Sequence, residues 1–222
     1  MTTTEDTKRP PVTGWQRSLV LFIDRQILGL SRHWLAAFNL LIAIYTLLPV
    51  LAPVFMAYGA PGLGRLIYIL YSPACHQLPQ RSFFLFGPKA IYMVDELWAL
   101  GVIDKTDIFT LKQFAGSLQV GYKMALCERD MALYGGLLVG GLVFVFVRKR
   151  LRPLSLLAYG LCLLPMALDG GTQLLFLRES NWVLRLITGG LAGLSTVWLI
   201  YPYVEDAFNE VRWQAQKQVN KA

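Results

Sequence analysis

Residues 154–177, LSLLAYGLCLLPMALDGGTQLLFL, decide the fold class of this chain. The 24-residue stretch is long enough to cross a bilayer, because about 20 helical residues at ~1.5 Å each span the ~30 Å hydrocarbon core. Asp169 is the only acidic residue in it, and an unpaired carboxylate at this depth would be costly. We therefore expect a multi-pass membrane protein in which Asp169 is neutralised, paired or placed against a polar cavity.

The composition supports this class. The chain has 222 residues, of which 55% are hydrophobic and 16% charged, and its mean hydropathy is +0.46. A soluble domain usually has about 25% charged residues. With such an apolar excess, the net charge of +7 favours anionic lipid headgroups over nucleic acid as partners. Three cysteines are too few for a disulfide scaffold.

Three other segments have the length and apolar character of membrane spans. We predict an all-α polytopic membrane protein with four transmembrane helices, at residues 34–58, 131–147, 154–177 and 182–203. The prediction divides the chain into three parts. Residues 1–33 contain a disordered start (1–13) and a cytoplasmic interfacial helix (15–33). Residues 34–204 form the membrane domain, with an outward helical and re-entrant segment at 59–130, and residues 205–222 form a cytoplasmic tail.

Two glycine pairs are expected at helix contacts. Gly136 and Gly140, and likewise Gly189 and Gly193, are four residues apart in predicted spans. Small residues at this spacing let helix backbones approach closely. Packing within the bundle is favoured here over a homodimer seam.

The basic residues predict the orientation. The cluster at residues 148–152 lies between the second and third spans, and basic residues also surround both ends of the chain. By the positive-inside rule both termini and this cluster are cytoplasmic, in the cell (plasma) membrane. A fifth span at residues 66–86 would instead place the basic cluster at 148–152 on the outer side of the membrane. Its prolines and polar residues favour a short helix at 63–72 followed by a broken or re-entrant turn.

With this topology, polar residues from separate segments collect at the outer face. Asp169 and Gln173 share one helix face because they are four residues apart. The complete set comprises Cys75, His76, Gln77, Arg81, Cys127, Arg129, Asp130, Asp169, Gln173, Asn181 and Arg185. Their convergence predicts a polar site at the outward face.

These residues also carry a resemblance. The segment Cys75-His76-Gln77-Leu78-Pro79-Gln80-Arg81-Ser82-Phe83 resembles the signature of the domain-of-unknown-function 2085 family of small prokaryotic membrane proteins. Further counterparts are Cys127-x-Arg129 with Tyr134-Gly135, Pro165-x-x-x-Asp169-Gly170-x-x-Gln173, and Asn181-x-x-x-Arg185-x-x-Thr188-Gly189. The resemblance covers roughly residues 63–194 and implies a compact helical membrane protein without an established activity.

Two departures from the family pattern are informative. Family members often have a second cysteine where this chain has Asp130, and they have fewer residues between the two cysteine motifs than the stretch at 87–126. Aspartate cannot form a disulfide, but Zn²⁺ accepts cysteine, histidine and carboxylate ligands. We therefore expect Zn²⁺ or another divalent metal as a cofactor. Its predicted ligands are Cys75, His76, Cys127 and Asp130.

Several alternatives stay open. A disulfide between Cys75 and Cys127 suits the oxidising side equally well, and a pair between Asp169 and Arg129 or Arg185 could only lock the bundle. The sequence shows no familiar catalytic motif, so a catalytic role is unknown. Three functions remain open. The first is a protein with an outward site for a metal or polar ligand, which includes an enzyme acting on a lipid-linked or envelope substrate. The second is an accessory subunit that docks through residues 87–126 and 15–33, and the third is a small proton- or ion-coupled transporter.

Overall fold

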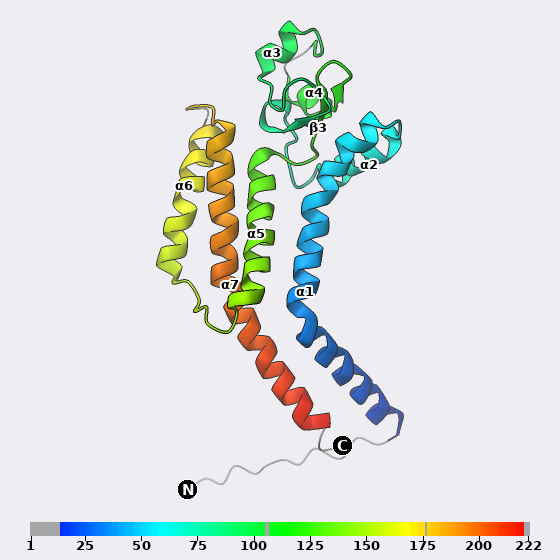
Figure 1. Ribbon diagram of the computed structural model, residues 1–222, viewed down its shortest axis with the longest axis vertical. Coiled ribbons are helices and arrows are strands. Elements are labelled where there is room, and N and C mark those ends of the chain that lie inside the picture. The colour runs from blue at the N-terminus through cyan, green and yellow to red at the C-terminus, as the bar shows by residue number, and fades with distance from the viewer. Residues whose placement is uncertain (1–13, 105–106, 176, 220–222) are drawn as a thin grey trace. The chain divides into compact units, whose positions relative to one another are not determined.

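The chain is mostly helical. The computed structural model describes residues 14–104, 107–175 and 177–219, and the predicted disorder of residues 1–13 lies outside them. Among the described residues there are seven α-helices (Figure 1), namely α1 (Trp15–Ala57), α2 (Pro61–Tyr71), α3 (Val94–Ala99), α4 (Ile108–Gln113), α5 (Glu128–Val147), α6 (Leu156–Leu174) and α7 (Trp182–Val219). A 3₁₀ helix, η1 (Pro79–Arg81), and three strands, β1 (Phe84–Leu85), β2 (Gly116–Ser117) and β3 (Gly121–Lys123), complete the fold.

Contacts divide the chain into two units. The first contains Met1–Trp34 and Val204–Ala222, and the second contains Leu35–Tyr203. In the first unit the Trp34 indole Nε1 donates a hydrogen bond to Glu205 Oε2 at 2.9 Å, and the Trp34 ring stacks on Phe208 with the centroids 5.6 Å apart. These contacts join the first part of α1 to the last part of α7.

The predicted boundary between the interfacial helix at 15–33 and the first span at 34–58 lies inside a single helix. Helix α1 continues from Trp15 to Ala57. Ser31, which could have capped a new helix, donates its hydroxyl to Leu28 O at 3.0 Å and stays within the same helix. The predicted tail likewise continues α7 through Pro202 to Val219.

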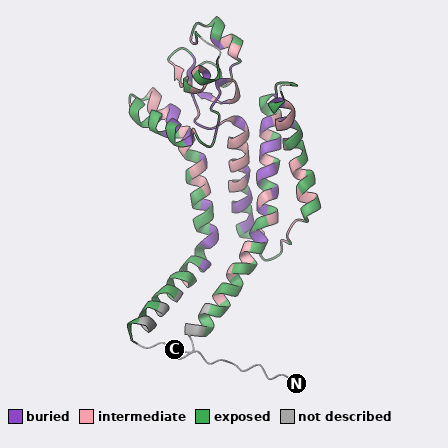
Figure 2. Cartoon of the chain, turned by 180° about the vertical axis from the view of Figure 1, so that it is seen from behind, coloured by how far each residue is buried: buried purple, intermediate pink, exposed green. Residues whose placement is uncertain are grey.

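In the part of the chain that the structure describes, three stretches are long and apolar enough, by length and composition, to cross a membrane. They are Arg25–Ala57, Glu128–Val147 and Trp182–Gln214. Many of their large apolar side chains are exposed, and exposed residues run along the helices in Figure 2. Helix α6, which contains most of the predicted span 154–177, is not among the three.

Helices α5 and α7 pack closely through the predicted glycine pairs. A Cβ added to Gly193 would lie 2.1 Å from Leu133 O, and one added to Gly136 would lie 2.6 Å from Gly190 O. Neither position has room for a methyl group without separating the two backbones. The expected packing within the bundle is therefore confirmed for these glycines.

Helix α2 lies against the end of α1 in the second unit. A Cβ on Gly64 would come within 3.0 Å of Ala52 O, so the two backbones nearly touch. The Tyr71 hydroxyl donates to Tyr45 O of α1 at 2.8 Å. The predicted short helix at 63–72 is thus present, two residues earlier at its start, as α2.

The segment between α2 and α5 is not purely helical, which corrects the all-α prediction. It contains a small antiparallel sheet in the order β1-β3-β2, beside a core that includes Phe84, Tyr92, Leu97 and Val120. Strands of two or three residues are too short to show an alternating pattern, so the sequence does not reveal them. The helices of this segment are α3 and α4.

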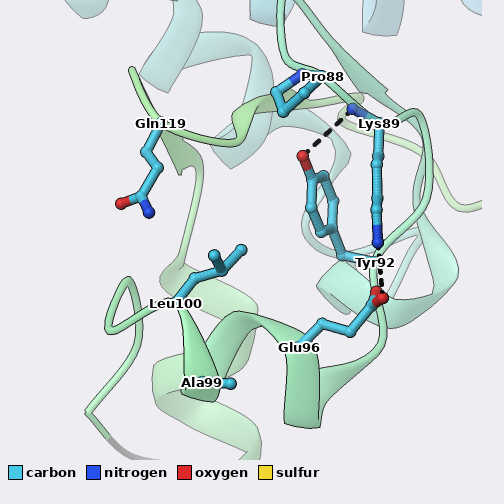
Figure 3. A pocket seen from close by; sticks show the side chains of 7 residues that line it. All are labelled: Pro88, Lys89, Tyr92, Glu96, Ala99, Leu100 and Gln119. Atoms are coloured by element: carbon cyan, nitrogen blue, oxygen red, sulfur yellow. Dashed lines mark hydrogen bonds and ion pairs between the residues drawn. The ribbon is translucent and has the colours of Figure 1, made fainter.

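A hollow of about 400 Å³ lies beside α3. Figure 3 shows the side chains that line it. The Lys89 backbone N–H donates to the Tyr92 hydroxyl at 3.3 Å, and Lys89 Nζ pairs with Glu96 at 2.8 Å. This ion pair is exposed, and such pairs contribute little to stability. The hollow carries no cluster of chemically reactive side chains.

Candidate functional site

The Cys75 motif forms a tight turn after α2. The Cys75 backbone N–H still donates to Tyr71 O at 3.0 Å, and Gln77 then adopts a left-handed conformation with φ 52°. The buried Gln77 side chain donates from Nε2 to Tyr68 O at 2.8 Å and to Ala125 O at 3.0 Å. These bonds hold the turn between α2 and the strand that leads to Cys127.

Lys123 also holds the turn. Its side chain is 1% exposed, and Nζ donates to Gln77 O, to Lys112 O at 2.9 Å and to Leu111 O at 3.4 Å. Burial lowers the pKa of Lys123 to about 7. No sequence pattern singles out this lysine, because its three acceptors are backbone carbonyls from distant segments.

Three of the four predicted metal ligands come together. The Cys75 and Cys127 sulfurs and a carboxylate oxygen of Asp130 all lie within 4.8 Å of one another. Cys127 caps the start of α5 and Asp130 is in its first turn, so both project from one turn of helix. The Cys127 backbone N–H donates to Cys75 Sγ at 3.2 Å. His76 is exposed and does not belong to this cluster.

The two thiols form a coupled pair, and both cysteines are free in the structure. A hydrogen bond from the Cys127 thiol to the Cys75 sulfur lowers the pKa of Cys75 below its ordinary value, and the same thiol–thiol bond, with burial, raises the pKa of Cys127 well above it. Cys75 is therefore the sulfur that becomes a thiolate first. A thiolate is the form of cysteine that binds a metal ion.

Beside this cluster lies a cavity of about 300 Å³, here called the arginine cavity. Cys127 and Asp130 line it directly. Its other lining residues include five members of the predicted polar set: His76, Arg81, Arg129, Gln173 and Arg185. The polar residues of four separate segments therefore meet around one cavity.

Asp169 is the centre of the first charge network. It is 2% exposed and pairs with Arg129 at 2.5 Å and with Arg178 at 2.7 Å. Gln173, one turn further along α6, accepts from Arg129 at 3.2 Å and donates to Glu179 at 2.9 Å. The expected pairing of Asp169 with Arg129 is present, and Arg178 is an additional partner.

Glu128 and Arg185 form the second network. Glu128 is fully buried, and its Oε2 lies 2.9 Å from Arg185 Nη1. Arg185 also donates to Ser180 O at 2.5 Å and to Gln80 O at 3.2 Å. This guanidinium therefore joins the start of α5, the α6–α7 connection and the Cys75 motif.

Some predicted residues have a different place, and others were missed. Asn181 accepts from the Leu184 backbone N–H at 2.8 Å and so caps α7, without lining the arginine cavity. The predicted polar set did not include Glu128 or Glu179. Glu128 pairs with Arg185, and Glu179 pairs with Arg81 at 3.3 Å. The excess of arginines over carboxylates in the predicted set was the signal that could have found them.

Comparisons with known proteins agree with this description. The model of a family described as a predicted membrane protein, the domain-of-unknown-function 2085 family, matches residues 117–199, which include Cys127 and Asp169 but not Cys75. The uncharacterised protein MJ1492 of Methanocaldococcus jannaschii is 34% identical over 159 residues, which cover 68% of this chain and 80% of the relative. No solved structure matches the chain. The identity over four fifths of the relative shows that this chain belongs to the domain-of-unknown-function 2085 family of predicted membrane proteins.

Proposed function

We propose that this protein binds a divalent metal ion of the zinc class between Cys75, Cys127 and Asp130 and presents it to the arginine cavity. The observation that carries the proposal is the approach of the three ligand atoms to within 4.8 Å of one another. Two sulfurs and one carboxylate are a donor set that Zn²⁺ accepts. The pKa of Cys75, lowered by the hydrogen bond from the Cys127 thiol, favours the thiolate form that a metal ion requires.

Three protein ligands leave one position of a tetrahedral ion open. Open positions are typical of zinc sites that bind water or a substrate. Cys127 and Asp130 line the arginine cavity, so a ligand in the cavity would reach the open position. His76, the fourth predicted ligand, also lines the cavity.

The proposed membrane arrangement has four spans with both termini cytoplasmic. Helix α6 supports a fourth span because its buried residues are Asp169 and Gln173, whereas most of its leucines, such as Leu157 at 77%, are exposed. Such inverted burial suits a helix with lipid outside and a polar cluster inside. Its 19 residues measure about 28 Å at ~1.5 Å per residue.

Metal analysis of the purified full chain tests the proposed site. About one zinc-class ion per chain is expected, with loss of the ion in Cys75→Ser and in Cys127→Ser. Cys162→Ser is the matched control, because Cys162 does not belong to the cluster and should leave the metal content unchanged. A metal-free parent protein whose Cys75 and Cys127 resist alkylation until reduced would show a disulfide and overturn the proposal.

Thiol labelling in intact cells tests the arrangement. Leu118→Cys, at a position 90% exposed, should react with an impermeant reagent above the parent signal. Lys149→Cys, on the exposed α5–α6 connection, should react only after the membrane is opened. The reverse pattern would contradict the orientation without bearing on the metal.

A further inference from the structure

A second cavity, of about 660 Å³, lies between α2 and α4 and is here called the α2–α4 cavity. This volume is within the range of about 300–1,000 Å³ typical of ligand sites. Three of its lining residues are basic, and none of the described residues lining it is acidic. The basic residues are Arg65, Lys112 and Lys123.

None of the three basic side chains has a carboxylate partner among the described residues, and Arg65 and Lys112 are the two whose charge is offered to a ligand. Arg65 is exposed on α2 and takes part in no ion pair there. Lys112 Nζ donates to a backbone carbonyl, Ser72 O, at 3.1 Å, and Lys123 likewise donates only to carbonyls. Lys123 Nζ donates to the backbone carbonyl of Lys112 at 2.9 Å, so the two lysines lie side by side at the cavity. An anion beside Arg65 and Lys112 would meet no competing carboxylate among the described lining residues.

One side of the cavity adjoins an exposed apolar surface. Arg65, Ile69 and Ser72 line the cavity along one stripe of α2, at intervals of three and four residues. The neighbouring stripe shares Ile69, which is 69% exposed, and adds three leucines that are 51–62% exposed: Leu63, Leu66 and Leu70. Phe109 of α4, 75% exposed, adds an aromatic ring to the lining.

We propose that the α2–α4 cavity binds the phosphate headgroup of an anionic phospholipid, whose acyl chains lie along the apolar stripe of α2. The unpaired cations match the phosphate, because basic residues at a membrane surface attract anionic lipids. The apolar stripe matches the chains, because exposed apolar helix faces bury themselves among lipid chains. A soluble anion or an acidic protein segment would satisfy the charges but would leave this stripe uncovered.

The test uses the full chain, delipidated in neutral detergent and titrated with phosphatidylglycerol or phosphatidylcholine under native mass spectrometry. One tight phosphatidylglycerol should bind and phosphatidylcholine should not. A surface cation contributes about fivefold to anionic-lipid affinity. Arg65→Gln should therefore weaken binding about fivefold, and Arg65→Gln with Lys112→Gln about 30-fold. Lys89→Gln, an exposed lysine that lines a different hollow, is the matched control and should bind as the parent does.

Three results would overturn the proposal. They are equal binding of both lipids, unchanged phosphatidylglycerol affinity in Arg65→Gln, and full displacement of the lipid by glycerol phosphate at equal concentration. The last would identify a soluble phosphate ligand as the occupant. Arg65→Gln keeps the test decisive if the double variant fails to fold, because Arg65 is exposed and has no hydrogen-bonded partner among the described residues.

Discussion

The arginine cavity and the α2–α4 cavity share one turn of the chain, since His76 and Leu78 line the first and Gln77 lines the second. In the arginine cavity each guanidinium is paired with a carboxylate: Arg81 with Glu179, Arg129 with Asp169, and Arg185 with Glu128. In the α2–α4 cavity the two lysines donate to backbone carbonyls, and Arg65 has no ion-pair partner among the described residues. The first set of charges is balanced within the protein and the second is not.

This difference separates two uses of positive charge. A buried arginine with its carboxylate fixes neighbouring segments, and removal of one partner leaves an uncompensated charge. Arg185 illustrates this role, because it joins three separate segments around the cysteine cluster. Cations without carboxylates remain available to an outside anion. The comparison therefore predicts structural effects at the first cavity and ligand effects at the second.

The largest expected effect is at Glu128. Glu128→Ala leaves the buried guanidinium of Arg185 without its closest carboxylate, and breaking a buried ion pair costs about 3–5 kcal/mol of unfolding free energy. Unfolding in mixed detergent micelles measures the loss. Glu96→Ala removes an exposed ion pair and is the control, with stability expected to stay at the parent value. Equal losses in both variants would mean that burial of the pair is unimportant.

A smaller loss is expected at Asp169. Asp169→Ala leaves Arg129 and Arg178 unpaired, but their side chains are 22% and 42% exposed, so water compensates part of the charge. We expect a loss of about 2 kcal/mol. Asp169→Asn should lose less, because it keeps the shape and one acceptor oxygen. A stable Asp169→Ala protein with no lipid binding or metal defect would show that this network is dispensable.

The last effect is a pH dependence at Lys123, which is small near pH 7 and grows as the pH rises. Its pKa is about 7 in the folded chain against an ordinary 10.5, so between these values the unfolded chain binds more protons and stability rises with pH. Relative to Lys123→Met, the parent should gain about 1.4 kcal/mol per pH unit above pH 7. Parallel stability curves for the two proteins from pH 7 to 9 would show that Lys123 stays charged.

The sequence predicts the membrane class and the convergence of polar residues, but not their pairing. The length of an apolar stretch identifies helices such as α5. Asp169 is recognised because it is an acidic residue inside an apolar stretch. The partners of Arg185 come from residues 80, 128 and 180, and one sequence carries no signal for such distant contacts. The α2–α4 cavity is hidden for the same reason, since Lys112 and Arg65 meet only after α4 lies against α2.

The continuous helix α1 and the small sheet show other limits. Ser31 is a residue type that can end a helix, yet its hydroxyl bonds within the helix instead. Strand β3 is three residues long and pairs with β1 and β2, which depends on a tertiary arrangement and not on local propensity. Helix boundaries were accordingly predicted less well than the existence of the helices.

The most direct test of the central claim is X-ray absorption at the metal edge of the purified full chain. The account predicts two sulfur ligands at ~2.3 Å and oxygen or nitrogen ligands at ~2.0–2.2 Å, as expected for a zinc-class ion held by Cys75, Cys127 and Asp130. Cys127→Ser should give no metal-edge signal, because the ion is expected to be lost from that variant. A bound metal with no sulfur ligand, or a metal-free protein with a Cys75–Cys127 disulfide, would contradict the account.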